Sequence, residues 1–134
     1  MQINPYVSFN GNCAEAVALY EKAFKIKAKV IQYKDAPKEV SRLAPENFIY
    51  HAQLRINDDI IVLQDVLPQY ATQIGNNVMI TLYVDEYDTV TAREIFRVLK
   101  EDGEIEGKAE QCLWTKCIGR LTDRFGVSWN ICKC

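Results

Sequence analysis

The chain has 134 residues, of which 49% are hydrophobic and 25% charged, and its formal net charge is −2 at pH 7. This length suits one domain or two small modules that share a core, and the composition is typical of a globular protein. A slightly acidic balance, with no Lys/Arg cluster on any predicted element, argues against nucleic-acid binding. No apolar run approaches the roughly 20 residues that cross a bilayer, and the start lacks signal-peptide character. We therefore expect a cytoplasmic protein with neither nucleic-acid nor membrane partners.

The five cysteines do not form a recognisable metal or disulfide pattern. They show C-x₄-C and C-x-C spacings with no CxxC pair, which does not match zinc sites. An odd number of cysteines, in a chain without an export signal, favours reduced thiols that act as small hydrophobic residues. Cys13 lies at the start of a predicted helix, where the dipole can lower a thiol pKa. No His or second Cys lies near it in sequence, so we expect a structural role for all five.

Alternating polarity and helical spacing divide the first half of the chain into elements. Val17, Tyr20 and Phe24 form one apolar stripe at helical spacing. The expected elements are a strand at Gln2–Phe9, a helix at Cys13–Phe24, a strand at Lys25–Tyr33, a loop at Lys34–Glu46, and a hairpin at Phe48–Asp65 that turns at Asn57-Asp58.

The same order of strands and helix is expected again after a polar linker at 66–77. The expected elements are a strand at Val78–Val84, a helix cap at Asp85–Asp88, a helix at Thr89–Leu99, and strands at Glu104–Ala109, Cys112–Leu121 and Val127–Cys132. A shift of 75 positions superposes six apolar residues of the two halves, beginning with Val7 on Leu82. The sequence therefore predicts an α+β fold of two βαβββ modules, 1–65 and 78–134, within one domain 1–134.

Each predicted sheet has one apolar face for its helix and one polar, aromatic face. The polar faces carry the single histidine, His51, along with Tyr6, Ser8, Gln53, Gln64, Tyr83 and Asn130. Two such sheets that curve toward each other would form a mixed β-sheet cleft lined by these residues, the usual form of a small-molecule pocket. The alternative is that these faces form a dimer interface or meet solvent.

Four segments together resemble the vicinal oxygen chelate superfamily, which includes glyoxalase I, extradiol dioxygenases and bleomycin- or fosfomycin-resistance proteins. The resemblance is to its PhnB-like (3-demethylubiquinone-9 3-methyltransferase-like) branch and spans essentially the whole chain. The segments are INPYVSFNGNCAEAVALYEKAF, YKDAP, YHAQLRINDDIIVLQD and LTDRFGVSWNIC. The resemblance implies a glyoxalase-like fold, commonly a homodimer, and a small-molecule ligand.

The resemblance also implies four metal-ligand positions, which fall at about Asn4, Gln64, Met79 and Asn130. None is a carboxylate or an imidazole, and a thioether and amide oxygens are weak ligands for divalent ions. We therefore predict no metal and no cofactor. The chain also lacks the glycine-rich strand-to-helix loop that holds S-adenosylmethionine in common methyltransferases.

Two functions remain open. The first is metal-independent binding of a small molecule by Tyr6, Ser8, Gln53, Gln64, Tyr83, Trp114 and Asn130, where Trp114 resembles the aromatic of the family's FWG segment. The second is an enzyme with His51, which resembles the histidine of the family's HA-x-L strand, as general acid/base for isomerisation or group transfer. A third possibility is that the polar faces make only dimer contacts. Trp129 alternates with Ser128 and Asn130, so we assign it to the core rather than to the site.

Overall fold

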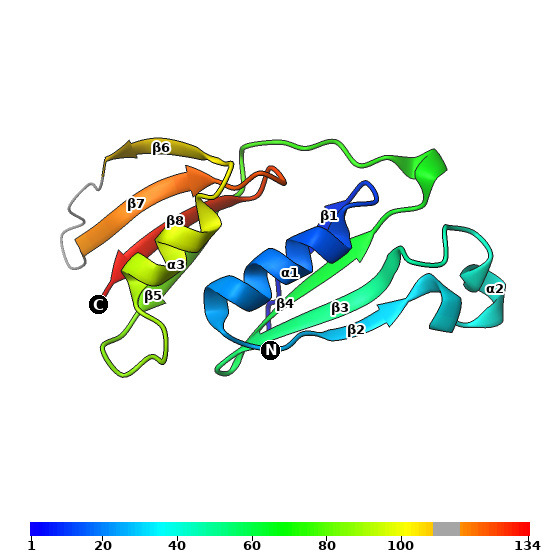
Figure 1. Ribbon diagram of the computed structural model, residues 1–134, viewed down its shortest axis with the longest axis horizontal. Helices are drawn as coiled ribbons and strands as arrows, with labels where there is room; N and C mark the ends of the chain where they lie inside the picture. Colours follow the sequence, from blue (N-terminus) through cyan, green and yellow to red (C-terminus); the bar gives the residue numbers. More distant parts are fainter. Residues whose placement is uncertain (109–115) are drawn as a thin grey trace. The chain divides into compact units, whose positions relative to one another are not determined.

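A computed structural model of the protein describes residues 1–108 and 116–134 and divides the chain into two compact units. The first unit comprises Met1–Glu21 and Ile26–Gln73, and the second comprises Lys22–Lys25 and Ile74–Cys134. In each unit a strand and a helix precede three further strands (Figure 1). The predicted α+β class and βαβββ repeat are therefore confirmed, while the cleft between the sheets stays a prediction.

The first unit contains a four-stranded sheet in the order β1-β4-β3-β2. Its elements are β1 (Tyr6–Phe9), α1 (Cys13–Phe24), β2 (Lys29–Gln32), β3 (Ile49–Ile56) and β4 (Asp59–Asp65), except that the last three residues of α1 belong to the second unit. Strands β1 and β4 run parallel, and the other pairs are antiparallel. Asn57, with a φ of 54°, makes the β3–β4 turn where the sequence predicts it, because Asn tolerates the left-handed conformation that tight hairpins need.

Three predictions for the first unit need correction. Strand β2 covers Lys29–Gln32 and ends before Tyr33, which begins a 3₁₀ helix. Strand β1 begins at Tyr6 rather than Gln2, since the four residues after Met1 are all exposed and lie outside the strand. The predicted loop at 34–46 contains the end of a 3₁₀ helix, Tyr33–Asp35, and helix α2, Lys38–Ser41. Pro37 precedes α2 directly, and its fixed φ suits the entry to a helix.

The second unit repeats the same strand order as β5-β8-β7-β6. Its elements are β5 (Ile80–Val84), α3 (Ala92–Leu99), β6 (Glu104–Lys108), β7 (Lys116–Thr122) and β8 (Ser128–Lys133), with a 3₁₀ helix at Pro68–Tyr70 in the first unit before them. As in the first sheet, the outer strand β5 runs parallel to its neighbour β8. The part of the predicted Cys112–Leu121 strand before residue 116 lies outside the described residues.

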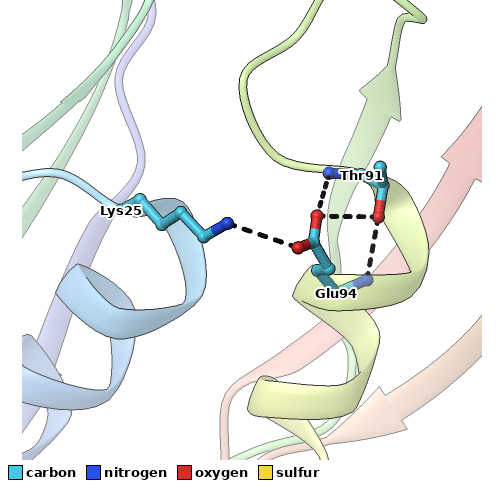
Figure 2. A network of polar contacts seen from close by, with 3 residues as sticks. All are labelled: Lys25, Thr91 and Glu94. Atoms are coloured by element: carbon cyan, nitrogen blue, oxygen red, sulfur yellow. Dashed lines mark hydrogen bonds and ion pairs between the residues drawn. The ribbon is translucent and has the colours of Figure 1, made fainter.

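Helix α3 begins later than predicted because a local capping box fixes its start. The helix begins at Ala92, and Thr91 is its N-cap. The Thr91 side chain accepts a hydrogen bond from the Glu94 amide (3.2 Å), and the Glu94 carboxylate accepts one from the Thr91 amide (2.9 Å), as Figure 2 shows. Asp85–Asp88, the predicted cap, instead forms a turn in which the Asp88 carboxylate accepts from the Asp85 amide.

The helices bury one side each, as the apolar stripes predict. In α1 the residues Ala16, Leu19, Tyr20 and Ala23 are almost fully buried, and in the first sheet Leu54 and Leu63 are completely so. Trp129 of β8 is also fully buried, and its ring centroid lies 5.9 Å from that of Phe24. The assignment of Trp129 to the core is therefore confirmed. Within residues 1–108 and 116–134, no helix is long and apolar enough to cross a membrane.

Candidate functional site

Strands β1, β3 and β4 bring five of the predicted site residues to one face of the first sheet. Parallel pairing places Ser8 beside Gln64 and Tyr6 beside Val62, while antiparallel pairing places Gln53 on the other side of Val62. Because register partners share a face of the sheet, these side chains are neighbours. The residues Tyr6, Ser8, His51, Gln53 and Gln64 are hereafter called the first-sheet site.

Gln64 connects the two β1 residues of the first-sheet site. The Tyr6 hydroxyl donates to Gln64 Oε1 (3.1 Å), and Gln64 Nε2 donates to Ser8 Oγ (3.0 Å). The amide is thereby held at both ends in one orientation. Since Ser8 Oγ is the acceptor in this chain, its own proton is available to donate to another group.

His51 is oriented by its neighbour Gln53. The Gln53 Nε2 atom lies 3.2 Å from His51 Nε2. An amide nitrogen only donates, so in this contact the imidazole Nε2 is the acceptor, and Nδ1 is the ring atom left to donate. The Tyr6 ring meets the imidazole edge-on at a centroid distance of 6.3 Å. The site therefore presents an imidazole N–H donor beside a phenol ring.

The Tyr6 phenol stays protonated throughout the neutral pH range. Partial burial is the main reason that its pKa is raised above the ordinary value, and the neighbouring Tyr50 and Cys13 raise it further. A neutral phenol both donates to Gln64 and keeps its oxygen as an acceptor. Tyr6 is 55% exposed, so the residue keeps surface available for contact.

A buried carboxylate that the sequence analysis did not single out fixes the elements around this site. Asp65, only 1% exposed, follows Gln64 directly at the end of β4. Its Oδ1 accepts from the amides of Gly11 (2.8 Å) and Cys13 (3.0 Å), and its Oδ2 accepts from the amide of Ile49 (2.9 Å). One side chain thus ties the start of α1 and the start of β3 to β4, and Asp65 is a positioning residue for the first-sheet site.

Cys13 has the structural role that the sequence favours. It is completely buried, and burial raises the pKa of its thiol far above the ordinary value, with the Asp65 carboxylate as the second cause. Both causes act in the direction opposite to the lowering that a helix start can give. A thiol in this environment stays protonated and is a poor nucleophile.

Two other predicted site residues, Tyr83 and Asn130, lie on the second sheet. Tyr83 of β5 pairs with Cys132, and Thr81 pairs with Asn130. The Asn130 Oδ1 atom is buried and, within the described residues, has no hydrogen-bond partner. Whether these residues share a site with the first sheet stays a prediction, and Trp114 lies outside the described residues.

Three of the four metal-ligand positions that the resemblance implies hold residues that do not suit a divalent ion, and the fourth, Asn130, offers a single amide oxygen, which is a weak ligand. Both ends of the Gln64 amide already form hydrogen bonds, while Asn4 is exposed before the start of β1. Met79 supplies only a thioether, which suits soft ions. In residues 1–108 and 116–134, no three His, Cys, Asp or Glu side chains are grouped so that they could hold a metal. We therefore derive no chemistry through a metal.

The chain forms two four-stranded mixed sheets, and in each half a strand and a helix precede three further strands. This arrangement is the fold of the vicinal oxygen chelate superfamily, as the sequence predicts. The chain belongs to the family described as 3-demethylubiquinone-9 3-methyltransferase, whose sequence model matches residues 1–132.

Proteins of known sequence or structure agree with this assignment. Protein YjdN of Escherichia coli (strain K12) is 29% identical over 98% of this chain and 94% of its own. The crystal structure of PA1353 from Pseudomonas aeruginosa has a TM-score of 0.82 and 29% identity, covering 99% of this chain and 97% of that one. The fosfomycin resistance protein FosX from Mesorhizobium loti, at 10% identity, shares the fold alone, with a TM-score of 0.56 and coverage of 100% and 91%.

The methyltransferase description is not matched by a site for S-adenosylmethionine of the common type. Such sites lie at the carboxyl ends of mostly parallel sheets, beside a glycine-rich loop. Each sheet here contains one parallel pair, and the other pairs are antiparallel. In the β1–α1 turn the Gly11 and Cys13 amides already donate to Asp65. The residues do not fit that cofactor, so we derive no methyl transfer.

Proposed function

We propose that the protein binds a small polar organic molecule on the first-sheet site without a metal ion. The observation that carries this proposal is the continuous set of contacts Ser8–Gln64–Tyr6–His51–Gln53, which spans three strands. Polar side chains fixed by one another are pre-organised, so a ligand does not have to order them on binding.

The donors left by these contacts define the class of ligand. His51 Nδ1 and the Ser8 hydroxyl can each donate, and the exposed part of the Tyr6 ring can contact an apolar or flat group. A carbonyl or carboxylate oxygen suits these donors, since hydrogen bonds to charged acceptors are the stronger ones. We propose a small carboxylic acid or carbonyl compound with a short apolar part.

A thermal-shift screen of metal-free protein tests the proposal. Protein treated with EDTA is screened against a panel of small carboxylic acids and ketones, because a ligand selective for the native state raises the melting temperature. The screen is repeated with Zn²⁺, Mn²⁺ and Ni²⁺, and metal content is measured on protein purified without chelator. A stoichiometric metal, or binding only in its presence, would contradict the proposal.

The variant Tyr6→Phe examines whether a compound found in the screen occupies this site. Loss of the hydroxyl frees the Gln64 amide, and we expect affinity to fall by roughly tenfold, about 1.4 kcal/mol. Tyr87→Phe is the matched control, because Tyr87 is an exposed tyrosine in a turn of the second unit. Equal effects of the two variants would place the ligand elsewhere.

His51→Gln distinguishes binding from catalysis at the same site. Glutamine keeps a hydrogen-bond donor but cannot act as a general acid/base near neutral pH. A binding protein is expected to retain affinity within about threefold, since the glutamine amide replaces the imidazole N–H as the donor. An enzyme that uses His51 would instead lose turnover of the compound while still binding it.

A homodimer and a cytoplasmic location belong to the same proposal. Strand β2 lies at the edge of the first sheet, and its Val30 and Ile31 are each 43% exposed. Exposed β-branched residues on an edge strand favour pairing with another strand. Light scattering coupled to size-exclusion chromatography measures the mass directly, and replacing Ile31 with Lys is expected to shift a dimer toward monomer.

A further inference from the structure

Two cysteines of the second sheet lie directly opposite each other on neighbouring strands. Cys117 of β7 is the register partner of Cys132 of β8, in an antiparallel pair. Their Sγ atoms are 2.6 Å apart, whereas a disulfide bond measures about 2.05 Å. The two side chains therefore already point at each other from opposite positions of the ladder, so a bond between them needs no rearrangement of the strands.

The position of this pair in the sheet allows a reagent to reach it. The next register step on from Cys117 is irregular, which interrupts the ladder beside the pair. Although Cys117 and Cys132 are only 8% and 1% exposed, a ladder with an irregular register beside the pair opens locally at a smaller cost in free energy than a continuous one.

We propose that Cys117 and Cys132 form a reversible oxidation site, which a low-molecular-weight disulfide converts into a cross-strand disulfide. The thiolate of one cysteine attacks the reagent disulfide, forming a mixed disulfide and releasing one small thiolate. The second cysteine, after losing its proton, attacks the protein sulfur of the mixed disulfide and expels the other small thiolate. In total the protein loses two protons and two electrons, and the reagent becomes two thiols.

Two other described thiols lack this arrangement. Cys13 is completely buried, and its raised pKa keeps it protonated. Cys134 is exposed, so it meets the reagent first, but no described cysteine sulfur lies within contact distance of it. A glutathione adduct is therefore the expected product at Cys134, whereas the pair resolves its own adduct by ring closure.

The site also lies on the polar face of its sheet, at the place that corresponds to Gln64. In the first sheet Gln64 pairs with Ser8, and in the second Cys132 pairs with Tyr83, the residue 75 positions after Ser8. Oxidation would tie β7 to β8 next to Tyr83. This inference does not depend on the proposed function of the first sheet.

Glutathione mixtures and thiol counting test the proposal on the full chain. Reduced protein is equilibrated with oxidised glutathione, quenched by alkylation under denaturing conditions, and analysed by intact mass and non-reducing peptide mapping. In the variant Cys134→Ser, we expect two thiols to be lost without an adduct, with one cross-linked peptide pair that contains Cys117 and Cys132. Dithiothreitol is expected to restore both thiols.

Three results would overturn the proposal. They are a full count of thiols after oxidation, stable glutathione adducts on Cys117 or Cys132, and a cross-link that joins either residue mainly to Cys112 or Cys13. Cys132→Ser serves as the second variant and is expected to form no intramolecular bond. Because wild-type mapping decides the outcome alone, a folding defect in Cys132→Ser would leave the test intact.

Discussion

The two units share one strand order but satisfy the start of their helices in different ways. In the first, Asp65 reaches from the end of β4 to the amides at the start of α1. In the second, the start of α3 is capped by Thr91 and Glu94, both adjacent in sequence. The first few amides of any helix need hydrogen-bond acceptors. The shared topology places both helices alike, but it does not determine which residue supplies the acceptor.

The polar faces of the two sheets differ in the same way. The first sheet carries hydrogen-bonding side chains that fix one another, with Gln64 at the centre. The second carries a cysteine pair and a buried amide oxygen that, in the described part of the chain, has no partner. Equivalent positions in a structural repeat therefore hold different chemistry, and our two proposals place ligand binding on the first sheet and oxidation on the second.

Removing Asp65 should produce the largest difference between the units. In Asp65→Ala, three amides from two distant segments lose a buried charged acceptor. Hydrogen bonds to a buried charged acceptor contribute more to stability than neutral ones, and we expect the free energy of unfolding to fall by roughly 3–5 kcal/mol. Urea denaturation followed by circular dichroism measures the change. A loss under 1 kcal/mol would mean that α1 and β3 do not depend on this carboxylate.

Removing the cap of the second unit should cost less. Thr91→Ala deletes a side-chain acceptor at an exposed helix start, and such caps contribute about 1 kcal/mol. Thr91→Ser keeps the hydroxyl and is the matched control, with an expected change close to zero. If Thr91→Ala destabilised the protein as much as Asp65→Ala, the contrast between a remote and a local cap would be wrong.

The smallest effect concerns the pH dependence of the α3 cap. The hydrogen bond from the Thr91 amide, followed by the Thr91 hydroxyl and Lys25, lowers the pKa of Glu94 from 4.5 to about 2. A lowered folded-state pKa adds stability that is complete above pH 4.5 and is lost as the pH falls toward 2. Titration of the Glu94 carboxyl carbon by NMR measures this pKa. A value near 4.5 would contradict the capping box.

Replacing Lys25 with Gln gives a finer test of the same pKa. Lys25 Nζ lies 3.3 Å from a Glu94 carboxylate oxygen, and both side chains are well exposed. Because solvent screens an exposed ion pair, the Glu94 pKa should rise only slightly in Lys25→Gln and clearly in Thr91→Ala. The reverse order would make the ion pair, rather than the cap, the main cause.

Local patterns predicted the elements that depend on local contacts. The helix at Cys13–Phe24 begins and ends at the predicted residues, and the hairpin turn is at Asn57-Asp58. The α3 start was missed although Thr91 and Glu94 show the Thr-x-x-Glu pattern of a capping box, so this signal was present in the sequence.

The roles of Asp65 and of the cysteine pair depend on contacts that sequence spacing does not reveal. Asp65 bonds to amides 16, 52 and 54 positions away, so at the end of a strand it reads as an ordinary turn residue. Cys117 and Cys132 are 15 positions apart and become neighbours only once the β7–β8 register is known. By contrast, the first-sheet site was partly predictable, because alternation along one strand assigns each side chain to a face.

The central claim is that the first-sheet site binds a small polar molecule without a metal. The most direct test is an NMR titration of EDTA-treated protein, labelled with ¹⁵N, with the strongest compound from the thermal-shift screen. We predict that the His51 ring and Gln64 amide resonances shift together and saturate at one ligand per chain, with no added metal. Shifts confined to other residues, or shifts that require a divalent ion, would contradict the claim.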